Sequence, residues 1–189
     1  LAFHPGDGVL DRGFDRPRHR GVLHPPAGRA DEVVVVVGEA GLVLRSVDGG
    51  NHWTEVPSPV KSSLFSVLAL PSGGFLACGL GGAVLHSANH GATWTVVETG
   101  DKHSWYGASM LGRHNVMLAG NGGALCSLAL DPDQGVTVKH RAREGYGSWS
   151  VVLSCQTKGA SKYLLAVGET GVKRLYLSAW TQSESGGAS

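Results

Sequence analysis

The stretch SVDGGNHW, residues 46–53, returns forty-one residues later as SANHGATW, residues 87–94. Both copies keep a serine, an aspartate or asparagine, a glycine and a closing tryptophan: Ser46, Asp48, Gly50 and Trp53, then Ser87, Asn89, Gly91 and Trp94. Asp and Asn side chains accept hydrogen bonds from N–H groups of their own turn, and glycine adopts backbone conformations that a side chain would penalise. The tryptophan ring can then fold back and cover the edge of a sheet. We therefore predict a fold-stabilising turn that occurs twice, each time between two strands.

The two turns belong to a longer repeat that is marked by pairs of glycines. Gly-x-x-Gly lies between two apolar runs in VVVVVGEAGLVLRS, GFLACGLGGAVLHS, NVMLAGNGGALCSL and YLLAVGETGVKRLY. The pairs are Gly38 and Gly41, Gly79 and Gly82, Gly120 and Gly123, and Gly168 and Gly171. This pattern predicts antiparallel hairpins in which glycine supplies the positive φ of the turn. With one further strand on each side, each unit has four short strands in about 40–48 residues, which is typical of a β-propeller blade.

The repeat sets the expected organisation of the chain. We predict an all-β, propeller-type protein with about four four-stranded blades, at residues 20–57, 62–98, 104–140 and 148–182. Residues 1–19 would be a lead-in that can donate a strand to a neighbouring blade, and residues 183–189 an exposed tail. In the third blade the turn has decayed to DPDQGVTV, which keeps Asp133 and Gly135, and in the fourth only Trp180 remains.

The composition limits the classes of function. The net charge is +1, so no global field points to nucleic acid or to an anionic membrane surface. No apolar run approaches the ~20 residues that a membrane-spanning helix needs. Basic residues gather at two places, which are Arg16, Arg18, His19 and Arg20, and Lys139, His140, Arg141 and Arg143. The chain begins without methionine, from which we expect a processed or incomplete product.

The 46–53 motif resembles the Asp-box (BNR) repeat. The longer phrase VGEAGLVLRSVDGGNHWTEVPSP, with SLFSVLAL and GLGGAVLHSANHGATW after it, resembles the photosystem II stability and assembly factor family. Residues 33–97 match the pattern of that family closely, whereas residues 98–180 match it only through the glycine pairs. Members of the family are seven-bladed propellers on the thylakoid-lumen or periplasmic side.

The resemblance implies a non-enzymatic scaffold without a cofactor. It would assemble or stabilise a membrane-bound photosynthetic complex by binding its protein subunits, on the lumenal side of the chloroplast thylakoid. Family members bind partly through a patch of arginines, for which the candidates here are Arg16, Arg18, Arg20 and Arg45. The alternative is an accessory subunit of another large organellar complex, such as a respiratory complex in the mitochondrion.

The length of the chain departs from the family. Seven blades need roughly 300 residues at this period, and 189 residues supply about four. An open arc would expose unpaired strand edges. The chain can therefore be a fragment, close with blades from a partner, or be a reduced relative that is covered by its neighbours in a larger assembly.

Asp-box propellers also include sialidases and other glycosidases, so a glycan-binding or sialidase-like protein is a further alternative. A glycosidase needs two carboxylates at a controlled separation, but acidic residues here fall mostly in turns, as Glu39 and Glu169 do. The Arg-Pro step in FDRPRH has the wrong spacing for a sialidase. We expect no catalytic residue and no nucleic-acid partner.

Metal ligands are not expected either. His86 and His90 are four residues apart, but one lies in an expected strand and the other in a turn, so they lack the shared helical face that makes this spacing useful. Cys78, Cys126 and Cys155 have no metal-ligand spacing and lie in or beside apolar runs, which indicates small buried residues.

Aromatic residues begin the first strand of successive blades. They are Phe65, Trp105, Tyr106 and Trp149. We expect them to pack in the core between blades, because basic residues, which a base-stacking surface would need, are not interleaved with them.

Overall fold

A computed structural model describes residues 33–131, 135–156 and 162–176. These residues form fourteen strands in four antiparallel sheets, with three short 3-10 turns and no α-helix among them. The predicted all-β class is therefore confirmed. The predicted lead-in, the tail, and the strands expected at 20–32 and 177–182 lie outside the described residues. The described part of the chain has no helix with the length and hydropathy to cross a membrane.

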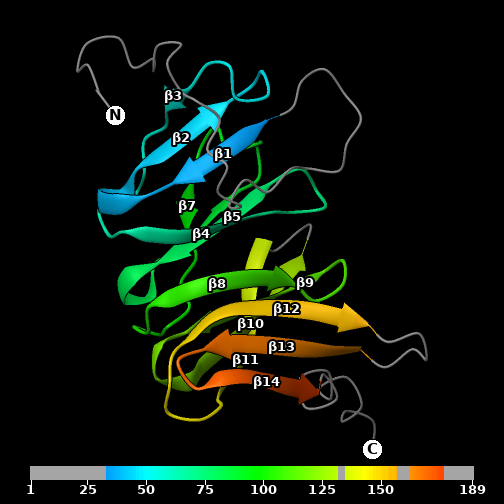
Figure 1. Cartoon of the computed structure of the whole chain (residues 1–189). Coiled ribbons are helices and arrows are strands. Elements are labelled where there is room, and N and C mark those ends of the chain that lie inside the picture. The colour runs from blue at the N-terminus through cyan, green and yellow to red at the C-terminus, as the bar shows by residue number, and fades with distance from the viewer. Residues whose placement is uncertain (1–32, 132–134, 157–161, 177–189) are drawn as a thin grey trace, which may run out of the picture. The chain divides into compact units, whose positions relative to one another are not determined.

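The chain divides into two compact units after Lys102, and each unit holds two sheets. In the first unit, the first sheet is ordered β1 (Val34–Val37), β2 (Val43–Ser46) and β3 (Thr54–Glu55). The second sheet is ordered β4 (Leu64–Ala69), β5 (Phe75–Gly79), β6 (Val84–Ser87) and β7 (Thr95–Val96) (Figure 1). The 46–53 and 87–94 segments connect the last two strands of these sheets, so each lies at the place predicted for it.

The second unit holds the third and fourth sheets. The third sheet consists of β8 (Trp105–Met110), β9 (Asn115–Gly120), β10 (Ala124–Asp131) and β11 (Gly135–Arg143), in that order. The fourth sheet is ordered β12 (Trp149–Gln156), β13 (Lys162–Gly168) and β14 (Gly171–Tyr176).

The third sheet corrects the interpretation of DPDQGVTV as a decayed copy of the turn. β10 and β11 pair along most of their length, from Asp131 opposite Gly135 to Ala124 opposite Arg143. A long hairpin thus replaces the turn and the two-residue outer strand of the first two sheets. β11 runs to Arg143. Asp133 lies outside the described residues.

The glycine pairs correct a second expectation. The second glycine of each pair has the expected positive φ, which is +85° at Gly82 and +78° at Gly41. The first glycine does not, because its backbone is extended, with φ −170° at Gly79. A Cβ on Gly79 would lie 2.1 Å from the carbonyl oxygen of Ser63, and one on Gly168 would lie 1.9 Å from that of Ser148. At Gly79, Gly120 and Gly168 the first glycine is therefore required for a close backbone approach rather than for a left-handed conformation, whereas a Cβ on Gly38 would come no nearer than 3.5 Å to another atom.

A β-bulge recurs at the start of three sheets and decides which large side chain is buried there. The register shifts directly after Leu64, Trp105 and Trp149. All three side chains are buried, whereas Phe65 is 45% exposed. The prediction that Phe65 packs in the core is wrong, since a bulge rotates the residues that follow it and Leu64 takes the buried position.

Each sheet has two faces that can be named from its first glycine, because successive strand residues point to opposite sides. The reference point is the first glycine of the Gly-x-x-Gly pair in that sheet. The odd face carries the residues one and three places before this glycine, together with their cross-strand partners. The even face carries the residues two and four places before it, together with their partners. In the first unit, the odd face of the first sheet packs on the even face of the second. This core includes Val35 and Val43 from one sheet and Phe75, Ala77 and Leu85 from the other.

The second unit repeats this arrangement. Its core joins the odd face of the third sheet to the even face of the fourth, through Met117, Ala119 and Leu125 on one side and Leu164, Ala166 and Leu175 on the other. The same pair of faces therefore meets in both units.

The cysteines follow the prediction in part. Cys78 and Cys126 are buried and Cys155 is half-buried, and all three are free thiols. Burial raises the pKa of the Cys78 thiol to about 12, which keeps it protonated and unreactive near neutral pH.

Candidate functional site

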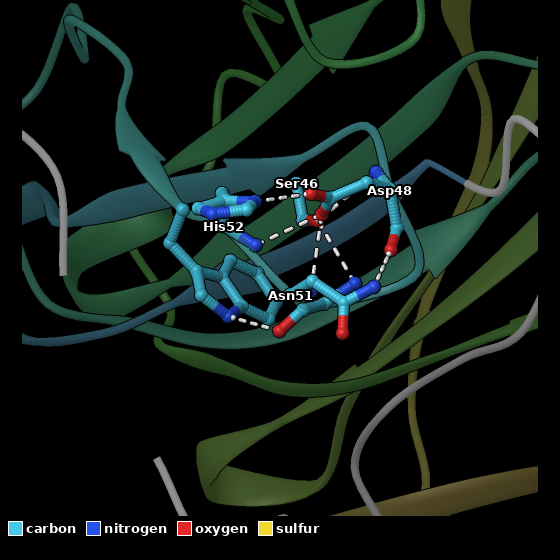
Figure 2. Close-up of polar contacts among 6 residues, drawn as sticks. Ser46, Asp48, Asn51 and His52 are labelled. Carbon is cyan, nitrogen blue, oxygen red and sulfur yellow. Dashed lines mark hydrogen bonds and ion pairs between the residues drawn. The ribbon is translucent and has the colours of Figure 1, made fainter. Parts of the chain in front are cut away.

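The 46–53 turn is held by a network around one carboxylate (Figure 2). Ser46, at the end of β2, donates from Oγ to Asp48 Oδ1 at 2.8 Å and accepts the N–H of Gly50 at 2.9 Å. Asp48 Oδ1 also accepts the N–H groups of Asn51 at 3.0 Å and His52 at 2.9 Å. The carboxylate therefore satisfies the backbone of its own turn.

The remaining oxygen of Asp48 contacts a histidine ring. The distance from Asp48 Oδ2 to His52 Nδ1 is 2.6 Å. The pKa of Asp48 lies well below its ordinary value, first because of the N–H of His52, then because of the His52 ring, and then because of the hydroxyl of Ser46. Because the Asp48 side chain is 36% exposed, solvent screens its electrostatic interaction with the His52 ring.

The 87–94 turn has the same geometry with an amide in place of the carboxylate. Asn89 Oδ1 accepts the Ser87 hydroxyl at 3.1 Å and the N–H of Thr93 at 2.9 Å, and Ser87 Oγ accepts the N–H of Gly91 at 2.9 Å. Asn89 Nδ2 donates to Thr93 Oγ1 at 2.9 Å, where the first turn has the Asp48–His52 contact. Asp48 and Asn89 share one role, which is to accept hydrogen bonds from backbone N–H groups, and this role needs no negative charge.

The closing tryptophans anchor both turns. Trp53 Nε1 donates to the carbonyl of Gly50 at 3.0 Å, and Trp94 Nε1 donates to that of Gly91 at 3.2 Å. Both rings are buried, and Trp94 belongs to the core between the first and second sheets. Trp94 thus ties the 87–94 turn to the even face of the second sheet.

Substitutions at Asp48 separate its hydrogen bonds from its charge. Asp48→Ala should lower the midpoint of thermal unfolding by several degrees, because two N–H groups lose their acceptor. Asp48→Asn should change it little at neutral pH, since Asn89 performs the same role. Thermal unfolding followed by circular dichroism measures both. If Asp48→Asn destabilised as much as Asp48→Ala at neutral pH, the charge rather than the hydrogen bonds would hold the turn.

The same variants have a defined pH dependence. The folded-state pKa of Asp48 is depressed, so its stabilisation is complete above the unfolded pKa of about 3.9 and is lost as the pH falls through the folded value. Acidification below about pH 4 should therefore destabilise the wild-type chain more than Asp48→Asn. An identical acid response of the two proteins would contradict this assignment.

Arg45 is the candidate arginine that lies within the described residues. Its Nε donates to the carbonyl of His90 at 2.7 Å. This bond runs from β2 of the first sheet to the 87–94 turn of the second, so Arg45 links the two sheets. The other candidates, Arg16, Arg18 and Arg20, lie outside the described residues.

The structure places the later basic cluster on one strand. Lys139, Arg141 and Arg143 are exposed on β11, which is the last strand of its sheet among the described residues. Arg143 Nη2 lies 2.7 Å from His103 Nε2. Positive charge on an outer strand discourages unwanted strand pairing. The cluster was visible in the sequence, but its position on a sheet edge depends on the unpredicted length of the β10–β11 hairpin.

His86 and His90, which are four residues apart in the sequence, lie in different kinds of structure. His86 lies in β6, where burial lowers its pKa, and His90 lies in the 87–94 turn with φ +55°. Across the described ranges, no three His, Cys, Asp or Glu side chains form a group that could hold a metal ion.

Neither the scan against protein-family models nor the search of curated proteins finds a match. The residues and the geometry described above therefore carry the functional argument.

Proposed function

We propose that this chain is a non-enzymatic scaffold of β-propeller type that assembles or stabilises a membrane-bound photosynthetic complex through protein–protein contacts. The observation that carries the proposal is the equivalence of Asp48 and Asn89. Both side chains accept the backbone N–H four residues further on, from His52 and from Thr93. A carboxylate that an amide replaces in this contact serves the fold rather than acid–base chemistry.

The sheets support the propeller part of the proposal. Four antiparallel sheets follow one another along the chain, and the odd face of one packs on the even face of the next in both units. Sheets of this size that stack face to face in sequence order are the building units of propellers. We interpret the 46–53 and 87–94 turns as Asp boxes at the outer ends of the first two blades.

The resemblance over residues 33–97 supports the photosynthetic part. It points to protein subunits on the lumenal side of the thylakoid as partners, bound in part through Arg16, Arg18 and Arg20. Rigid blades with binding segments at their edges suit this role, because recognition residues concentrate on loops that a stable framework positions.

Cross-linking inside the cell that encodes the chain tests the proposal. A tagged full-length protein should cross-link to subunits of a photosystem, as identified by mass spectrometry. Exclusive cross-links to respiratory subunits would overturn the assignment in favour of another organellar complex. Hydrolysis of a sialoside or another glycan by the pure protein would overturn the non-enzymatic role.

A triple variant tests the arginine patch in the same assay. Arg16→Ala, Arg18→Ala and Arg20→Ala together should weaken the association roughly tenfold or more without unfolding the chain. Lys61→Ala, which removes one exposed positive charge elsewhere, is the matched control and should leave association unchanged. Undiminished association of the triple variant would remove these arginines from the interface.

A further inference from the structure

The outermost strand of the third sheet is long. β11 pairs with β10 alone among the described strands. It has nine residues, whereas β3 and β7, the outermost strands of the first and second sheets, have two each. An outermost strand directs backbone N–H and C=O groups away from its sheet at alternate residues. β11 therefore offers an edge on which an extended segment of another protein can pair.

The second half of this edge is basic. Lys139, His140, Arg141 and Arg143 are exposed, and β11 contains no acidic residue. Arg143 Nη2 donates to His103 Nε2 at 2.7 Å, and a ring nitrogen that accepts a hydrogen bond belongs to a neutral imidazole, so this contact does not neutralise the guanidinium. The carboxylate that follows β11, Glu144, contacts Lys173 at 2.7 Å. The positive charge of this edge is therefore available to an anionic partner.

The register places two of the arginines on one face of the sheet. Arg141 is the cross-strand partner of Cys126, and Arg143 is that of Ala124, so their side chains point to the same side. A strand that pairs with β11 would lie about 4.8 Å from it and would present its own alternate residues on that side. Carboxylates at alternate positions of the added strand would thus lie within reach of both guanidinium groups, which can bind a carboxylate through two parallel hydrogen bonds.

A β-bulge divides the edge into two parts. The register shifts between Ser127 and Leu128, so that Lys139 is the extra residue between Val138 and His140 on β11. Bulges and lysines on an outermost strand discourage unselective pairing with other chains. The same charges favour an acidic strand, and specific recognition combines repulsion of wrong partners with attraction of the right one. The part of β11 after the bulge, residues 140–143, is therefore the docking edge.

The charge of this edge disfavours two other occupants. Pairing with β11 of a second copy would place cationic side chains opposite one another, and like charges that face each other destabilise a sheet. A single-stranded nucleic acid would need aromatic side chains on which its bases can stack, and the β11 sequence GVTVKHRAR contains none. An acidic peptide segment uses both the backbone groups of the edge and its charges.

We propose that residues 140–143 bind an extended acidic segment of a partner protein as an added strand, with Asp or Glu side chains at alternate positions beside Arg141 and Arg143. Backbone hydrogen bonds supply the affinity, and the arginines select the charge of the partner. This inference goes beyond the proposed function, because it concerns a surface other than Arg16, Arg18 and Arg20 and holds whichever complex the chain serves.

Fluorescence anisotropy of a labelled peptide, titrated with the full-length protein, tests the contact. The probe is a nine-residue peptide in which glutamate alternates with valine, and it should bind saturably. Arg141→Gln combined with Arg143→Gln should weaken binding about tenfold or more. The matched control, Lys61→Gln combined with Arg113→Gln, removes two exposed positive charges elsewhere and should bind like the wild type. A wild-type chain that does not bind the peptide, or a double arginine variant that binds it undiminished, overturns the proposal.

Two further comparisons separate strand addition from attraction between charges alone. N-methylation of alternate residues of the peptide keeps its charges and removes N–H donors. Of the two possible phases of methylation, the one that faces β11 should weaken binding about tenfold or more. Arg141→Glu combined with Arg143→Glu should bind a lysine–valine peptide in preference to the glutamate–valine peptide, with circular dichroism as the check of folding. Equal binding of both methylated peptides and the parent, or equally tight binding of a single-stranded oligonucleotide of the same charge, would overturn strand addition.

Discussion

Gly82→Ala should lower the free energy of unfolding by about 3 kcal/mol or more, which is a large loss for one methyl group. Two independent penalties add at this position. Its φ of +85° is left-handed, a conformation that costs a residue with a Cβ about 1–2 kcal/mol. The new Cβ would also lie 2.0 Å from the carbonyl oxygen of Asp101, so the backbone that leaves the second sheet would have to move.

The neighbouring glycine is the matched control. Gly81 also has a positive φ, +67°, but a Cβ there would meet nothing within 4 Å. The chain already places Ala40 at the equivalent position of the first sheet, with φ 53°. Gly81→Ala should therefore cost no more than about 1 kcal/mol. Urea unfolding of both variants measures the difference, and equal losses would show that the close approach to Asp101 is unimportant.

Trp94→Ala should destabilise the first unit by about 3–5 kcal/mol, the range for removing a large buried aromatic side chain. Trp94 is 7% exposed and packs in the core between the first and second sheets. The variant would leave a cavity at this junction and would also remove the bond from Nε1 to the carbonyl of Gly91. The 87–94 turn would then lose its connection to the sheet.

Two further variants separate these contributions. Trp94→Phe retains most of the apolar ring and loses the hydrogen bond, so the loss should be about 1–2 kcal/mol. Val96→Ala, in the adjacent short strand β7, removes a side chain that is 43% exposed and should change stability by less than about 1 kcal/mol. Denaturant unfolding measures all three, and a near-neutral Trp94→Ala would refute an anchoring role for the tryptophan.

Much of this fold could be predicted from the amino-acid sequence, because it depends on interactions between residues that are close together in the chain. The glycine pairs located the hairpins at the centre of each sheet, because a positive φ at Gly41, Gly82 and Gly123 is a property of the turn itself. The 46–53 turn was predictable for the same reason. All its hydrogen bonds join residues at most four positions apart, so eight letters contain both the donors and the acceptors.

Features that depend on distant segments could not be read in this way. The need for glycine at Gly79 comes from the carbonyl of Ser63, sixteen residues away, and not from its own dihedral angles. Leu64 is buried in the core where we predicted Phe65, because the pairing of β4 with β5 creates a bulge at this point. Arg45 was considered for a partner surface, yet its guanidinium is engaged with His90 forty-five positions away.

One physical cause separates the features that the sequence predicts from those that need the tertiary structure. Turn conformation and strand periodicity arise from neighbouring residues, so the sequence alone predicted the all-β class, the glycine turns, and the 46–53 and 87–94 turns. Which face of a sheet is covered, and by what, depends on contacts between sheets. The tertiary structure was therefore needed to show that odd faces meet even faces, and that Arg141 and Arg143 share one face of an outermost strand.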